Sequence, residues 1–265
     1  MKKPLFYVLL NIILLTKVHG QHLTHDVGIH IGASAIITDY GVRGDFLSSY
    51  GNRGTYLSIN HSIHFFHNNL KWNYDHPVWS HLAIKNEISF LTKTNLRHYG
   101  SFVERDNVLG NQLRAMTGSV SILSVGFQLE YYFYCLRTFL YPYTELKINP
   151  YMMMGLRHNW YKNTLNSTLG DWRENPQVLP QKWRPSEALA IGNGTDYSLL
   201  FGGGIRYRIQ PAIDVNIQLS WQYFFSDAID GLTARVDENI YNEWTVNFQV
   251  GLIFHLNFSK PLSLF

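Results

Sequence analysis

The stretch WTVNFQVGLIFHLNF, Trp244 to Phe258, decides the fold class of this sequence. Every even-numbered residue in it is apolar, whereas the odd-numbered positions are mostly polar or small. A period of two over this length predicts a long β-strand with one apolar face. Alternation alone leaves open whether that face meets a protein core or lipid, because soluble and membrane barrels share the period with opposite faces inward.

The N-terminal stretch MKKPLFYVLLNIILLTKVHGQ predicts a secretory signal peptide over residues 1–20. Lys2 and Lys3 precede an apolar run that is short for a membrane-spanning helix, and the small Gly20 follows it. The expected remainder is a barrel over 21–258 and a C-terminal tail over 259–265. Cys135 is the only cysteine, so no internal disulfide is possible.

Seven more segments alternate like the first. They lie within residues 27–38, 57–65, 82–90, 123–133, 146–157, 197–209 and 213–225. His61 and Asn86 fall on apolar faces and Pro150 lacks a ladder donor, so we expect bulges or strand ends near them. Eight strands in succession predict an all-β fold.

The connections between these segments alternate in length. Long ones follow the odd-numbered strands, at about 39–54, 95–119, 162–195 and 227–243. Those after the fourth and sixth strands are shorter, and the connection at 67–80 is the exception. Long outer loops with short periplasmic turns are typical of outer-membrane barrels.

Composition favours lipid as the partner of the apolar faces. Charged residues are 15% of the chain, against roughly 25% in ordinary soluble domains. The opposite faces carry mainly Gly, Ser, Asn, Gln and Thr, which suit a narrow barrel interior. We therefore predict an eight-stranded antiparallel transmembrane up-and-down β-barrel in the cell outer membrane. The formal charge of +3 does not indicate a nucleic-acid partner.

The sparse charges on the polar faces should pair with one another, because isolated buried charges are very costly. This predicted lumen network consists of Lys85, Glu87, Glu130, Arg157, Arg206, Arg208 and Asp214. Aromatic strand ends resemble interfacial girdles: Phe65, Phe90, Tyr223, Phe225, Trp244 and Phe258. Phe254, Leu256 and Phe258 look like the aromatic-ended last strand that outer-membrane assembly machinery reads.

Two stretches carry a family resemblance. HDVGIHIGASAIITDYG near the mature start and WQYFFSDAIDGL with YNEWTVNFQVGLIFHL at the end resemble the PorG-like outer-membrane β-barrels of Bacteroidota. The middle, GNQLRAMTGSVSILSVGFQLEYY, resembles a longer-looped branch of them, and the long loops at 95–119 and 162–195 depart from PorG itself. The resemblance implies a barrel associated with type IX secretion, a protein-transport apparatus with a periplasmic ring.

No motif indicates catalysis or a cofactor. The sequence lacks G-x-S-x-G and H-E-x-x-H, so we predict no enzyme activity. His61 and His64 point to opposite faces of a strand, and we predict no metal site there. Asp39, Asp227 and Asp230 could organise outer loops, either with Ca²⁺ or, as we favour, through Asx turns. The triplet Arg43–Asp45 is too short to establish adhesion.

Aromatic residues in the connections are the remaining signal. Trp172 and Trp183, among prolines, either pack their loop onto the barrel or mark a partner surface. Trp72, Tyr74 and Trp79 lie in the connection on the opposite rim. Aromatic connections on both rims without a catalytic set predict a scaffold or accessory subunit of an envelope complex, with an unidentified protein partner. The alternative is an outer-loop ligand-binding or adhesion protein.

Overall fold

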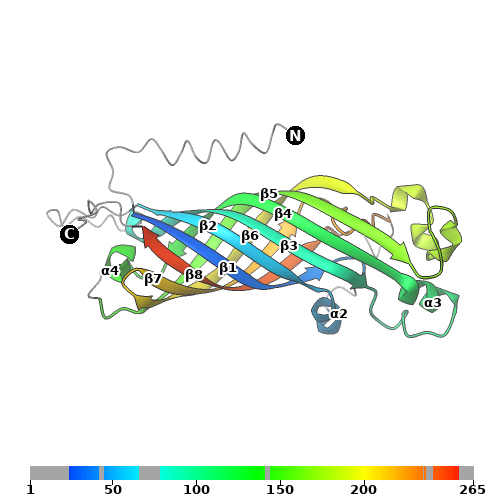
Figure 1. Ribbon diagram of the computed structural model, residues 1–265, viewed down its shortest axis with the longest axis horizontal. Helices are drawn as coiled ribbons and strands as arrows, with labels where there is room; N and C mark the ends of the chain where they lie inside the picture. The colour runs from blue at the N-terminus through cyan, green and yellow to red at the C-terminus, as the bar shows by residue number, and fades with distance from the viewer. Residues whose placement is uncertain are drawn as a thin grey trace, which may run out of the picture.

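The computed structural model describes residues 24–41, 45–65, 78–140, 144–234, 236 and 241–256. Eight strands form a closed antiparallel barrel in sequence order, and the first strand pairs with the last (Figure 1). They are β1 Thr24–Ile37, β2 Arg53–His64, β3 Leu82–Arg97, β4 Met116–Tyr132, β5 Ile148–Ser167, β6 Asn193–Gln210, β7 Ile213–Phe224 and β8 Trp244–Leu256. This confirms the predicted fold class. The predicted signal peptide and tail, with Phe258, Trp72 and Tyr74, lie outside the described residues.

In the described part of the chain, short helices occur only in the connections between strands. They are α2 Phe46–Gly51, α3 Val108–Ala115 and α4 Leu136–Leu140, with 3-10 turns η1 Trp79–His81, η2 Pro176–Val178, η3 Gln181–Trp183 and η4 Ser186–Ala188. None of the described helices is both long enough and apolar enough to span a bilayer. Figure 1 shows α4 at one end of the barrel and α2 and α3 at the other. We name these the periplasmic end and the outer end, since long loops mark the outer side.

The outer surface of the barrel is apolar and its interior polar. In β8, Phe248 and Val250 are exposed, whereas Asn247 and Gln249 are fully buried. The same division holds around the barrel, where Ile29, Ile59, Phe127 and many other large apolar side chains face outward. A closed barrel with this division has its apolar surface in lipid. The chain is therefore a transmembrane barrel of the outer membrane.

The strands β4, β5 and β6 are longer than a membrane requires. They contain 17, 20 and 18 residues, against about 9–11 for a transmembrane strand. The excess lies at the outer end. The predicted loops at 95–119 and 162–195 are therefore too long, because β4 already begins at Met116 and β5 continues to Ser167.

The reason for that error is a change of phase within the strands. On β4, the outward side chains are Ser119 and Ser121 toward the outer end and Leu123 and Phe127 below them. The inward side chains change in the opposite sense, from the buried Ile122 to polar residues. Toward the outer end, the outward face of β4 meets water and its inward face meets an apolar core. In the membrane part, the outward face meets lipid and the inward face meets the polar lumen. Because the apolar and polar positions exchange faces here, the alternation in the sequence is interrupted and the predicted strand is too short.

The level of the change is marked by a polar row on the outward face. Paired residues place Thr55, Thr92, Ser121, Lys162 and Asn193 side by side across β2 to β6. The adjacent row toward the membrane is Leu57, Phe90, Leu123, Trp160 and Thr195. On β2 to β5, the outward side chains change from polar to apolar between these two rows.

The expectation of bulges at His61 and Asn86 is wrong. These residues pair directly with each other, and the β2–β3 register is continuous. His61 instead finds a polar partner on the same face: its Nε2 lies 3.1 Å from His25 Nδ1, and the rings stack. Register shifts occur between Thr94 and Leu96 and between Arg208 and Gln210. Pro150 is near the start of β5, as predicted.

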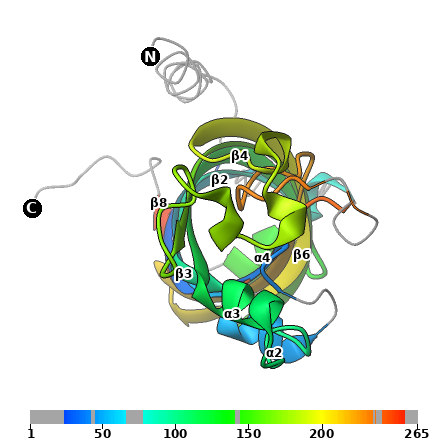
Figure 2. The same cartoon turned by 90° about the vertical axis from the view of Figure 1, so that its right-hand side faces the viewer.

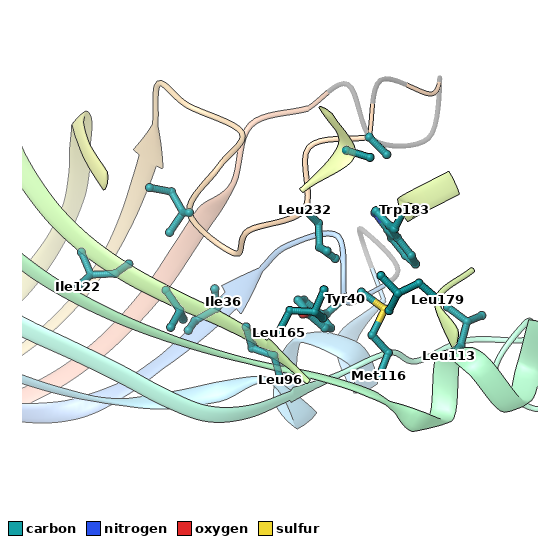
Figure 3. Packing of buried hydrophobic residues seen from close by; sticks show 14 of the residues in the cluster. Ile36, Tyr40, Leu96, Leu113, Met116, Ile122, Leu165, Leu179, Trp183 and Leu232 are labelled. Carbon is teal, nitrogen blue, oxygen red and sulfur yellow. The ribbon is translucent and has the colours of Figure 1, made fainter. Parts of the chain in front are cut away.

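An apolar cluster fills the outer end of the barrel (Figure 3). Inward residues of the extended strands, such as Ile122 and Leu165, meet Leu179 and Trp183 from the β5–β6 connection and Leu232 from the β7–β8 connection. Viewed along the barrel, the β5–β6 connection lies across the opening (Figure 2). We call its residues 168–192 the cap.

Candidate functional site

The structure places all the predicted lumen charges inside the barrel and pairs them. Lys85 Nζ lies 2.6 Å from Glu130 Oε1, and Arg157 Nη2 lies 2.5 Å from Glu87 Oε1. Arg206 and Arg208 share the Asp214 carboxylate, at 2.9 and 3.2 Å. Every one of these side chains is buried. Removing one partner of such a pair would leave an unpaired charge in the barrel, which is why the network fixes the packing of the interior.

Sequence reasoning missed several members of this lumen network. Asp26 is fully buried and lies 2.8 Å from Arg206 Nη2, 2.6 Å from His64 Nε2 and 2.7 Å from His255 Nδ1. The predicted first strand began at Val27, three residues later than β1 and just past Asp26. Tyrosine hydroxyls also take part: Tyr56 donates to Glu87 Oε1 at 2.9 Å and Tyr132 donates to Glu130 Oε2 at 2.7 Å.

The lumen is closed at the periplasmic end by α4. Leu136 and Phe139 of this helix are fully buried, and the Arg208 guanidinium lies 4.7 Å from the centre of the Phe139 ring. Asn149 holds the connection against β5, accepting from the Tyr134 backbone N–H at 3.1 Å and donating to the Tyr134 carbonyl at 3.0 Å. Together with the charge pairs, these contacts place buried side chains across the lumen in its middle and at its periplasmic end.

The cap closes the outer end. Trp183 is only 1% exposed, and the His98 ring lies between the rings of Tyr40 and Trp183 at 4.7 and 5.0 Å. Burial lowers the pKa of His98 to about 3, so its imidazole is neutral and packs as an aromatic ring. Trp172 is partly buried against the same cluster and donates from Nε1 to the Leu165 carbonyl at 2.9 Å.

These contacts decide between the two alternatives for the cap tryptophans. Both pack the loop onto the barrel, and Trp183 as a partner contact is wrong because it has almost no accessible surface. Trp79, in contrast, is half exposed at the periplasmic rim, 5.6 Å from the ring of Phe65. Among the proposed partner contacts that the structure describes, Trp79 is the most accessible. Phe254, of the proposed assembly signal, faces outward on β8.

The cap is fastened to the β7–β8 connection by backbone bonds. Leu189 and Leu232 form an antiparallel bridge. Ala190 N–H donates to the Gly231 carbonyl and Thr233 N–H to the Ala188 carbonyl, both at 2.9 Å. Asn163 of β5 braces the junction by donating to the Ala228 carbonyl at 2.9 Å and accepting from Gly192 N–H at 2.8 Å.

Beneath this junction lie buried carboxyl groups that we call the latch: Asp39, Asp230 and Glu243. Asp230 accepts from the Asp39 backbone N–H at 2.9 Å, and Asp230 N–H donates to Glu243 Oε1 at 3.3 Å. Asp230 and Glu243 form no ion pair with a basic residue in the described part of the chain. Burial and then the nearby Asp39 carboxylate raise the pKa of Asp230 to about 8. Burial and then Asp230 raise the pKa of Glu243.

Asp230 also forms the predicted Asx turn. Its Oδ1 accepts from Leu232 N–H at 2.8 Å, and Gly231 between them has a φ of 88°, a conformation that favours glycine. No group of three or more His, Cys, Asp or Glu residues in the described segments has the geometry to hold a metal ion. Of the Arg43–Asp45 triplet only Asp45 is described, and it caps α2 by accepting from Ser48 N–H at 2.9 Å.

The chain is similar in fold to solved outer-membrane proteins at very low identity. Ail, the attachment invasion locus protein of Yersinia pestis, solved with the heparin analogue sucrose octasulfate, is 12% identical with a TM-score of 0.42, covering 89% of this chain and all of that one. A major outer membrane protein from Thermus thermophilus is 12% identical with a TM-score of 0.48, covering 90% and 100%. Neisserial surface protein A is 11% identical with a TM-score of 0.42, covering 87% and 96%.

No protein-family model matches the chain, and no curated protein matches it. Its class therefore follows from its own architecture. A closed barrel of eight strands, with an apolar outer face and a charge-paired lumen, is a small outer-membrane β-barrel.

Proposed function

We propose that this protein is a non-enzymatic, non-conducting scaffold or accessory subunit of an envelope complex, and that the complex belongs to type IX secretion. The observation that carries the proposal is that the lumen is closed at both ends, by α4 and by the cap. Buried side chains across the lumen of the described residues argue against an open channel, so the rims remain for contact with other molecules. The resemblance of the first strand and of the last two strands to PorG-like barrels supports the choice of complex.

The periplasmic rim supports a docking role. Four apolar residues are each about half exposed there: Val78 and Trp79 of the 67–80 connection, and Phe133 and Tyr134 after β4. Exposed aromatic side chains are enriched where proteins bind one another. A partner that binds this rim would meet these side chains first.

The test is affinity purification of the tagged protein from native membranes in mild detergent. We expect a stoichiometric envelope complex with the wild type, a marked loss of the partner with Trp79→Ala, and no loss with Phe102→Ala on the opposite rim. Secretion of type IX cargo should fall with the first variant only. Recovery of the barrel alone, or equal recovery of partners with both variants, contradicts the scaffold.

A second candidate is supported by the connection between β3 and β4. Its tip exposes Phe102, Val108 and Leu109, and the Arg105 guanidinium lies 4.3 Å from the Phe102 ring. An exposed apolar tip that also carries charges of both signs, Glu104, Arg105 and Asp106, fits an adhesion or ligand-binding loop. Phe102→Ser with Val108→Ser would then reduce binding to the target surface while leaving the co-purifying proteins unchanged.

A further inference from the structure

A groove on the lipid-facing surface lies where the outward polar row meets the apolar one. It has a volume of about 390 Å³ and spans β3 to β6. Leu123 of β4 forms its floor, between the larger Phe90 on β3 and Trp160 on β5. The groove exists because a short side chain stands between two aromatic ones in the same row of the sheet.

The groove is lined almost entirely by apolar surface, and most of its polar residues lie at its outer edge. Ser121, Lys162 and Asn193 line it there, one row further from the membrane. Lys162 is exposed, and its ammonium forms no hydrogen bond or ion pair with any residue that the structure describes. A cation at this level stands beside lipid headgroups, where basic side chains attract phosphate.

The aromatic wall on the β5 side is held in place by its neighbours. The His158 ring contacts Trp160 edge-on at 4.4 Å and Tyr197 at 4.7 Å, centre to centre. The indole of Trp160 is therefore supported from the membrane side. A supported wall costs less to order when a ligand binds, which favours retention of one molecule over exchange with bulk lipid.

We propose that this groove binds one anionic phospholipid of the outer leaflet. An acyl chain lies over Leu123 between Phe90 and Trp160, and the phosphate is held by the Lys162 ammonium with Ser121 and Asn193 at the rim. The assignment rests on the continuity of the groove with the lipid-facing surface and on the charge complementarity between Lys162 and phosphate. It is independent of the scaffold role.

The test uses native mass spectrometry of the intact, delipidated barrel in detergent, titrated with phosphatidylglycerol or with phosphatidylcholine of the same acyl chains. We expect one phosphatidylglycerol to be retained by the wild type. Lys162→Gln should weaken that retention about fivefold, the loss expected for one cation at a membrane surface. Lys162→Arg should retain the anionic lipid, and so should Lys147→Gln, which removes a cation near the periplasmic end.

Trp160→Ala tests the wall. It should weaken retention of both lipids, provided that the mobility shift on heating in SDS gels shows the barrel folded. Equal retention of the two lipids by the wild type would mean that only unspecific lipid surrounds the barrel. Equal phosphatidylglycerol retention by wild type and Lys162→Gln would also overturn the proposal.

Discussion

At the residue scale, the lumen is governed by pairs in which each charge depends on its partner. Glu87 and Arg157 are both buried, and Glu87 Oε1 lies 2.5 Å from Arg157 Nη2. We expect Glu87→Met alone to lower the free energy of unfolding by about 3–5 kcal/mol, because Arg157 loses its counter-charge. Replacing both residues by Met should cost much less. Urea unfolding in lipid vesicles measures both, and equal losses would show that the pair does not act as a unit.

The latch gives the cap a dependence on pH. Well below pH 4, Asp230 is neutral whether the cap is open or closed. Between its ordinary range near 4 and its raised pKa of about 8, the open form loses the proton and the closed form keeps it. Closure therefore becomes less favourable as pH rises, and the part of the loss due to Asp230 levels off above about 8.

We expect hydrogen exchange in residues 168–192 to accelerate from pH 6 to 9 beyond the intrinsic chemical effect. Asp230→Asn carries no ionisable group, so its extra acceleration should be reduced to the part due to Glu243. If the variant and the wild type respond to pH alike, Asp230 does not control the closure of the cap.

At the element scale, the outward face of a single β-strand contacts water at one end and lipid further along. Outward residues of β4 face water at Thr117 and lipid at Phe127, on the same face of the same strand. We expect Phe127→Arg to destabilise the barrel by about 2–4 kcal/mol or block its assembly, whereas Thr117→Arg should change little. The comparison can be made by folding into vesicles at rising urea. Similar effects at both positions would put the lipid boundary elsewhere.

The same strands show how far the sequence could be read. Alternation predicted the strand number, the order and the lipid-facing side. Within the membrane each face of a strand meets one medium, either lipid or the polar lumen, so the residues alternate regularly between apolar and polar. It failed from Met116 to Ile122, where inside and outside exchange polarity and the backbone ladder simply continues. The latch was only half visible: Asp39 and Asp230 stood out near turns, whereas Glu243 reads as an ordinary strand entry until the connections are placed in space.

At the scale of the whole molecule, the described barrel has buried charge pairs in its lumen and an apolar cluster at each end. We expect no large stable conductance in planar bilayers, because side chains occupy the interior of an eight-stranded barrel. A general porin reconstituted in parallel gives the positive control. A porin-like current from the wild type would contradict the closed lumen and with it the argument that function resides at the rims.

The position of Lys162 on β5 also indicates how far the strands extend beyond the membrane surface. Beyond it, β5 continues to Ser167 as a rigid part of the sheet. At roughly 3.3 Å per residue and a tilt of about 45°, this wall rises by about 10–15 Å before the connections begin. The extended strands thus raise the connections above the membrane surface. Its tips clear the headgroup layer and stay within reach of large water-borne molecules, while the same strands remain anchored in the lipid below.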